Sequence, residues 1–195
     1  MKVLFAILSY LFGAFPTGYI LYYLCEKKDI RAYGSQSIGA TNMLRLKGWL
    51  FALPVIFMDI LKGFLPVFLA LKLFPDKRFA LLCGFLAVLG HCFPIYIKLK
   101  GGKGVATAVG VYLALALLPL FIGIGVFLII IALTRYVSLG SILAMLSMPF
   151  SIYFVQGNQD NAILSIAIFL LIVIKHGGNV RRLIDGNERK LGEKE

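Results

Sequence analysis

Long apolar stretches separated by short polar clusters make up nearly the whole chain. The apolar stretches lie near residues 3–25, 49–74, 79–97, 105–133, 137–155 and 161–175. A helix that crosses a membrane needs about 20 mainly apolar residues, and most of these stretches approach or exceed that length. The pattern therefore predicts an all-α integral membrane protein, a compact helical bundle in a single domain over residues 1–195.

The stretch 105–133 is longer than one ordinary span, and Pro119, Gly123 and Gly125 lie near its middle. If it forms a hairpin, one side of the membrane receives all of the 20 Lys and Arg except Lys2, Lys62, Lys72, Lys77 and Arg78. A single crossing would divide them almost evenly, against the tendency of Lys and Arg to stay cytoplasmic. We therefore predict seven transmembrane helices, two of them short (about 105–118 and 120–133), with the N-terminus outside and the C-terminus cytoplasmic.

The composition, 60% hydrophobic and 15% charged, excludes an ordinary soluble domain. A net charge of +11 can indicate nucleic-acid binding, but these basic residues flank apolar stretches, which is typical of membrane orientation. No nucleic-acid partner is expected. Cys25, Cys83 and Cys92 lack metal-ligand spacing, and an odd number cannot form a complete disulfide framework. Neither a metal nor a cofactor is expected.

Three polar clusters interrupt the apolar pattern, at 34–45, 101–104 and 176–188. In the predicted topology all three reach the cytoplasmic face, so we expect them to share one site. Hydroxyls, glycine backbone and fixed cations there suit a phosphorylated substrate that meets a lipid. Each cluster taken alone is equally compatible with a solvated loop.

The first cluster supplies four neutral hydrogen-bonding side chains, those of Ser35, Ser37, Thr41 and Asn42. Arg45 can offer a planar fork to a phosphate. Asn42 and Arg45 are three residues apart and would share one face of a short helix. The alternative is an interfacial amphipathic turn that Trp49 anchors among the headgroups.

The second cluster is glycine-rich. Gly101, Gly102 and Gly104 let backbone N–H groups approach an anion closely, and Lys103 adds a positive charge at a helix start. The pattern is not a Walker A loop, because Gly104 stands where that motif needs a hydroxyl. The alternative is a flexible turn with one lysine reaching the interface.

The third cluster spaces His176, Asn179 and Arg182 by three residues, which predicts one helical face. His176 can orient or deprotonate a hydroxyl, and Asn179 can fix its tautomer or hold a substrate. A histidine that merely caps helix carbonyls is the alternative. Glu188 can brace the arginines or act as a base.

Polar residues also occur inside the spans. Asp59 and Lys62 are three residues apart in the second span, where a structural ion pair is the simplest arrangement and a role in binding or proton movement the alternative. His91 ends the third span. It can satisfy interfacial groups or support the nearby glycine-rich loop.

Four patterns resemble those of the bacterial acyl-phosphate-dependent glycerol-3-phosphate acyltransferases, over essentially the whole chain. They are GSxxxGATNxxR at Gly34–Arg45, DxxKG at Asp59–Gly63, GHxxP at Gly90–Pro94 with GGKGVAT at Gly101–Thr107, and KHxxNxxRLxxGxE at Lys175–Glu188. The resemblance implies transfer of a fatty acyl group from acyl phosphate to the 1-hydroxyl of sn-glycerol 3-phosphate, which yields lysophosphatidic acid and phosphate at the bacterial plasma membrane. It implies membrane lipid as the surroundings, and a monomer is expected.

The resemblance also implies roles for residues. Ser35 and Arg45 would be essential, the glycine-rich loop with Thr107 would bind glycerol 3-phosphate, His176 and Asn179 would serve activity, and Glu188 would be structural. Charge on the carbonyl and the leaving phosphate would be stabilised by Arg45, Lys103 and Arg182.

The position five after each histidine, Tyr96 or Arg181, is not the Asp of the HxxxxD acyltransferases. An acyl phosphate is already activated, and its departing phosphate can accept the hydroxyl proton. We therefore expect His176 to orient the hydroxyl rather than to be an obligatory base.

Two other functions fit the sequence less well. A transporter of phosphorylated molecules would use Asp59 and Lys62 in a passage, but it needs polar residues at both faces. A lipid-binding scaffold without catalysis leaves the spacing of His176 and Asn179 unexplained.

Overall fold

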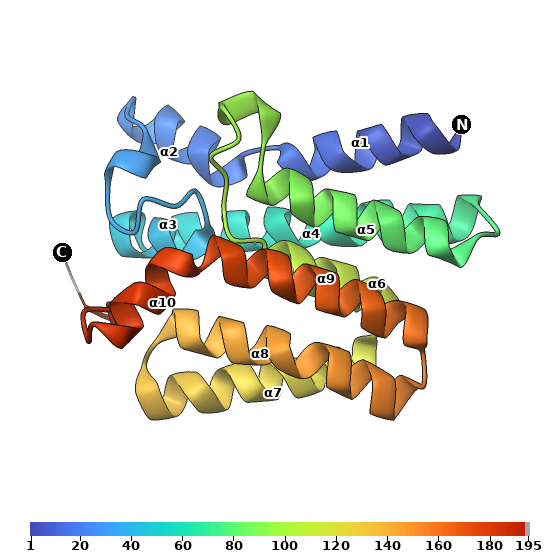
Figure 1. Ribbon diagram of the computed structural model, residues 1–195. Helices are drawn as coiled ribbons and strands as arrows, with labels where there is room; N and C mark the ends of the chain where they lie inside the picture. The colour runs from blue at the N-terminus through green and yellow to red at the C-terminus, as the bar shows by residue number, and fades with distance from the viewer. Residues whose placement is uncertain (194–195) are drawn as a thin grey trace. The chain divides into compact units, whose positions relative to one another are not determined.

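In the computed structural model, residues 1–193 are described, and they form helices joined by short loops, with no strand among them (Figure 1). The described chain divides into two compact units, Met1–Val111 and Tyr112–Glu193. The prediction of an all-α protein is confirmed for these residues.

The first unit contains most of the polar patterns. Its helices are α1 (Lys2–Ala14), α2 (Thr17–Glu26), η1 (Ile30–Ala32), α3 (Ala40–Lys47), α4 (Trp49–Leu73), α5 (Lys77–Cys92), η2 (Ile95–Ile97) and the start of α6 (Val105–Leu115). α1 lies along α5, and α4 packs against α5 as well (Figure 1). α3 lies against α4, at the end of the unit where α2 ends.

The apolar stretch 3–25 is two helices rather than one, because the chain breaks at Phe15 and Pro16. A proline has no N–H to donate, and it disfavours helical geometry in the residue before it. Phe15 accordingly has an extended ψ of 116°. Its carbonyl, no longer used by a continuous helix, accepts a 2.7 Å hydrogen bond from Lys62 Nζ.

α6 approaches α4 very closely. A Cβ placed on Gly63 would lie only 1.9 Å from the carbonyl oxygen of Thr107. Only glycine permits this approach, and it sets the first turn of α6 beside Lys62, the residue before Gly63. The glycine-rich loop therefore leads directly into a tightly fixed helix.

The second unit contains α7 (Leu117–Thr134), α8 (Val137–Ser151), the π-helical turn η3 (Ile152–Gln156), α9 (Gln159–Lys175) and α10 (Gly177–Ile184). α7 packs on α8, and α8 packs on α9 (Figure 1). α10 contacts α8 and α9.

The predicted helix boundaries 105–118 and 120–133 are wrong in detail. The break falls at Ala116 (φ −153°, ψ 62°), and α7 begins at Leu117. Pro119 lies within the first turn of α7, where backbone N–H groups need no partner inside the helix, so it does not interrupt the helix. α7 has 18 residues and is not short, whereas α6 has 11.

Within residues 1–193, five segments are long and apolar enough to cross a membrane: Lys2–Glu26, Trp49–Leu73, Lys77–Ile97, Leu117–Thr134 and Val137–Gln156. A sixth arises if α9 and α10 are taken together across their 62° bend. The number seven and the orientation of the termini stay predictions.

Candidate functional site

Asn42 organises the first polar loop. Its side-chain amide donates to the carbonyls of Ser37 (2.8 Å), Tyr33 (3.2 Å) and Ile30 (3.4 Å), and its Oδ1 accepts from the Ser35 N–H (2.8 Å). The residue is 1% exposed. A buried amide that satisfies four backbone groups fixes the loop, so Asn42, predicted to bind substrate, has a clear structural role.

The other residues of this cluster surround that scaffold. Ser35 and Ser37 are half-buried, and the Ser37 hydroxyl accepts from the Gly39 N–H at 3.3 Å. Thr41 and Arg45 lie on α3, which is helical through both Asn42 and Arg45 as the spacing predicts. The loop therefore presents its hydroxyls and a guanidinium from a rigid base.

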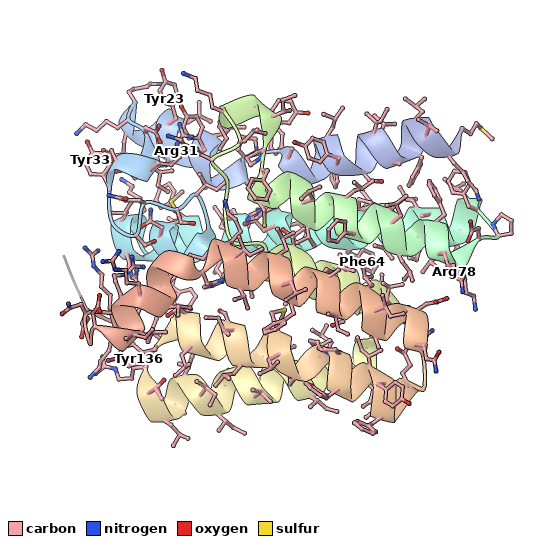
Figure 2. The ribbon with its side chains drawn as sticks, in the orientation of Figure 1. Tyr23, Arg31, Tyr33, Phe64, Arg78 and Tyr136 are labelled. Atoms are coloured by element: carbon pink, nitrogen blue, oxygen red, sulfur yellow. The ribbon has the colours of Figure 1, made fainter. Side chains whose placement is uncertain are left out.

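Arg31 joins this loop to the segment before the glycine-rich loop. Its Nη1 donates to the Ile97 carbonyl at 2.9 Å, and its Nε and Nη2 bind both carboxylate oxygens of Asp29. The hydrogen bond from Arg31 holds the pKa of Asp29 below its ordinary value. The Arg31 guanidinium also lies over the Tyr19 ring, 5.2 Å from the ring centre; Arg31 is labelled in Figure 2. Arg31 thus ties the segment before the first polar cluster to the segment before the glycine-rich loop, within the first unit.

The glycine-rich loop folds back onto the end of α5. The Gly102 N–H donates to the His91 carbonyl at 3.1 Å, and a Cβ on Gly102 would lie 2.1 Å from His91 Nε2. A Cβ on Gly101 would lie 2.2 Å from the same carbonyl oxygen. His91 therefore supports this loop directly, the second of the two roles considered for it.

Asp59 and Lys62 form the predicted ion pair, with 2.6 Å between Lys62 Nζ and Asp59 Oδ1. Both side chains are almost fully buried, and Lys62 Nζ also lies 3.4 Å from His91 Nδ1. A buried charge is tolerated only where it is paired and hydrogen-bonded. Each charge therefore has a partner inside the unit. The transporter alternative, which relied on Asp59 and Lys62 lining a passage, loses its main support.

Gly104 and Thr107 connect the loop to α6. Gly104 has φ +84°, a left-handed conformation that favours glycine. The Thr107 hydroxyl is fully buried and has no hydrogen-bond partner among residues 1–193. Lys103 precedes Gly104 and is half-buried. Their roles in substrate binding stay predictions.

Glu188 is the centre of a hydrogen-bonded group in the second unit. Its Oε1 accepts from Asn179 Nδ2 (2.6 Å) and Ser138 Oγ (2.7 Å), and its Oε2 accepts from Arg182 Nε (2.8 Å). Burial acts to raise the pKa of Glu188, but the three hydrogen bonds and the Arg182 charge hold that pKa below its ordinary value. Glu188 is therefore an ionised brace. Asn179 and Arg182 both lie in α10 at the predicted spacing, but His176 precedes α10 at the 62° bend after α9, so the three do not form one helical face as predicted.

His176 caps the end of α9 and is 2% exposed. Its Nδ1 lies 2.8 Å from the Ile172 carbonyl oxygen, which can only accept, so Nδ1 carries the proton. In the neutral ring Nε2 is then the accepting nitrogen. The Ile172 carbonyl therefore fixes the tautomer of His176. Asn179 does not, although this was one of the two roles expected for it.

The sequence alone did not single out three groups of these networks: Ser138, Arg31 and the carbonyl of Phe15. Pro16 marks the helix break that makes the Phe15 carbonyl available to Lys62. No local pattern marked the other two, because their partners are 50 and 66 residues away in the chain.

The family model described as glycerol-3-phosphate acyltransferase matches residues 3–186. A glycerol-3-phosphate acyltransferase from Endomicrobium trichonymphae is 41% identical over 191 residues, which cover 98% of this chain and 96% of the relative. One from Trichlorobacter lovleyi is 43% identical over 182 residues, 93% of each chain.

Solved structures agree. The crystal structure of PlsY, an integral membrane glycerol 3-phosphate acyltransferase, in its glycerol 3-phosphate form has a TM-score of 0.93 and 36% identity, over 98% of this chain and 96% of that one. The lysophosphatidic acid form gives a TM-score of 0.90 at 35% identity, over 98% and 95% of the chains. The chain is an integral membrane protein and belongs to the glycerol-3-phosphate acyltransferase family.

Proposed function

We propose that this protein transfers a fatty acyl group from acyl phosphate to the 1-hydroxyl of sn-glycerol 3-phosphate. The hydroxyl oxygen bonds to the acyl carbon, the bond from that carbon to the phosphate oxygen breaks, and the phosphate leaves with the hydroxyl proton. The products are 1-acyl-sn-glycerol 3-phosphate and inorganic phosphate. That the protein is an acyltransferase that acts on glycerol 3-phosphate is inferred from its family. The acyl donor and the product are part of the proposal.

The hydrogen bonds that Glu188 accepts are the observation that supports acyl phosphate as the acyl donor. Both of its oxygens accept hydrogen bonds, three in all, so this carboxylate is a brace and a poor base. Asp59, the buried carboxylate of the other unit, is paired with Lys62. A donor whose leaving group accepts the proton removes the need for a strong protein base.

The proposed roles follow from the chemistry of each side chain. Arg45, Lys103 and Arg182 offset the charges of two anionic substrates, which otherwise repel each other. Ser35 and Asn179 orient the reactants, and His176 accepts a hydrogen bond from the hydroxyl at Nε2.

We also propose seven crossings, with this chemistry at the cytoplasmic face of the bacterial plasma membrane. An 11-residue α6 is roughly 16 Å long, whereas the hydrocarbon layer is about 30 Å thick. Gly102, however, is bound to His91, which lies inside the candidate span Lys77–Ile97. In the proposed topology the chain between them folds back along the end of this span, so that α6 would begin below the membrane surface and have less distance to cover.

The test is a phosphate-release assay with purified protein in detergent, glycerol 3-phosphate and palmitoyl phosphate. We expect phosphate and lysophosphatidic acid in equal amounts, with both lost in Arg45→Ala. A carrier-protein thioester in place of palmitoyl phosphate serves as the alternative donor. Folded protein that releases no phosphate from palmitoyl phosphate would refute the proposed donor.

A further inference from the structure

We propose that Asp59, Lys62 and His91 are positioning residues that set the glycine-rich loop for glycerol 3-phosphate through Gly102. The inference rests on the proposed function and on the expectation that the glycine-rich loop binds the glycerol 3-phosphate used in that reaction. It goes beyond an ion pair that merely neutralises itself in the membrane.

Lys62 joins three separate parts of the first unit. Its Nζ donates to Asp59 Oδ1 on α4 (2.6 Å), to the Phe15 carbonyl at the break between α1 and α2 (2.7 Å), and lies 3.4 Å from His91 Nδ1 on α5. An ammonium has three hydrogens and no acceptor. These three partners therefore use its whole donor capacity and fix its position.

The same contacts fix the His91 ring. Nδ1 lies nearer to the Lys62 ammonium (3.4 Å) than to Asp59 Oδ1 (3.7 Å). Because an ammonium only donates, Nδ1 accepts, and the proton of the neutral ring lies on Nε2. A Cβ on Gly102 would lie only 2.1 Å from Nε2, so the ring leaves no room for a side chain at Gly102. The backbone is held too, since the Gly102 N–H donates to the His91 carbonyl at 3.1 Å. His91 thus touches Gly102 with both its ring and its backbone.

A buried ion pair is weak evidence for stability, since apolar residues of similar volume often replace one at no cost. Apolar residues, however, cannot hold the His91 ring in one orientation through hydrogen bonds. Here the charges orient one ring, and that ring sets the position of a loop that we expect to bind glycerol 3-phosphate. A shift of about 1 Å in such a group can cost about 100-fold in rate.

The consequence is specific to one substrate. Loss of the His91 ring should raise KM for glycerol 3-phosphate about tenfold or more and leave KM for palmitoyl phosphate within about twofold. Val88→Ala is the matched control, because Val88 is fully buried in the same helix and makes no polar side-chain contact. It should lower thermal stability without changing either KM.

The decisive experiment is a double-mutant cycle on the phosphate-release assay, with wild type, His91→Ala, Gly102→Ala and the double variant. Gly102→Ala alone should raise KM for glycerol 3-phosphate, because its methyl meets the ring. In the His91→Ala background the ring is absent, so Gly102→Ala should add less than about twofold. His91→Gln, whose amide oxygen can still accept from Lys62, provides a second background with a polar partner.

The outcomes separate this inference from the proposed function. A wild type that makes no lysophosphatidic acid refutes the function itself. An active wild type in which the two effects multiply in both backgrounds, or in which Val88→Ala raises the same KM as His91→Ala, overturns the positioning role.

Discussion

The side-chain amide of Asn179 donates to Glu188 Oε1 across 2.6 Å, within a group that also holds Ser138 and Arg182. An ionised carboxylate only accepts, so the nitrogen of the amide faces Glu188 and its oxygen is turned elsewhere. Asn179 therefore directs its amide oxygen, an acceptor, away from Glu188. An acceptor suits a substrate hydroxyl, the role proposed for this residue.

Replacing Glu188 by Gln should lower thermal stability at neutral pH, because an NH2 group would take the place of one accepting oxygen and face either the Arg182 donor or the Asn179 and Ser138 donors. The pKa of Glu188 is held below its ordinary value of 4.5 in the folded protein. Its ionised form therefore stabilises the fold above about that pH, and this contribution is lost as pH falls through the folded pKa. Thermal unfolding in detergent from pH 7 to pH 3 checks this, and the gap between wild type and variant should close below pH 4.5.

Lys190→Gln, in the same C-terminal segment but outside the Glu188 group, is the matched control and should give no such pH dependence. A gap between wild type and Glu188→Gln that stays constant over the whole range would show that the carboxylate charge does not stabilise this fold.

Asn42→Asp should harm the protein more than Asn42→Ala. The aspartate would turn an acceptor toward the three carbonyls that now receive the amide hydrogens, whereas alanine only leaves them unpaired, at about 1–3 kcal/mol. Both variants should lose activity together with thermal stability. Ser37→Ala, which removes one 3.3 Å hydrogen bond, is the control and should be mild. Equal stability of the two Asn42 variants would argue against the scaffold role.

Most spans follow from the apolar pattern within a few residues: α4, α5 with η2, α8 with η3, and α9. The breaks do not. Pro16 interrupts a helix, yet Pro54, Pro66 and Pro149 lie inside helices, so proline alone does not locate a break. Ala116 itself gives no signal, because alanine favours helix, and the nearby Pro119 indicated a break but placed it three residues too late.

In the candidate site, too, some contacts could be predicted from the sequence and others could not. Pairs three residues apart were predictable from helical spacing, such as Asp59 with Lys62 and Asn179 with Arg182. Partners distant in the chain were not. The Ser138 hydroxyl on Glu188 depends on how α8 meets the C-terminal segment, and this packing cannot be deduced from a single sequence.

His176→Gln should lower the rate without removing the acidic limb of the pH–rate profile. Nδ1 of His176 is committed to the Ile172 carbonyl, and Nε2 needs only to accept a hydrogen bond. The limb should remain because phosphate groups of the substrates themselves titrate near pH 6. The measurement is kcat/KM for palmitoyl phosphate from pH 5 to pH 9. Loss of the limb in the variant would instead identify His176 as the base.

The seven-crossing topology predicts which positions face the cytoplasm. In an active background with Cys25, Cys83 and Cys92 replaced, single cysteines at Lys77, Lys98 and Lys190, all exposed, report the sides. A maleimide that cannot cross membranes should label position 77 in intact cells. Positions 98 and 190 should react only after the membrane is opened, because α6 and α7 together return the chain to the same side. If residues 105–134 cross only once, positions 98 and 190 must react from opposite sides, and the placement of all three polar clusters at one surface fails with them.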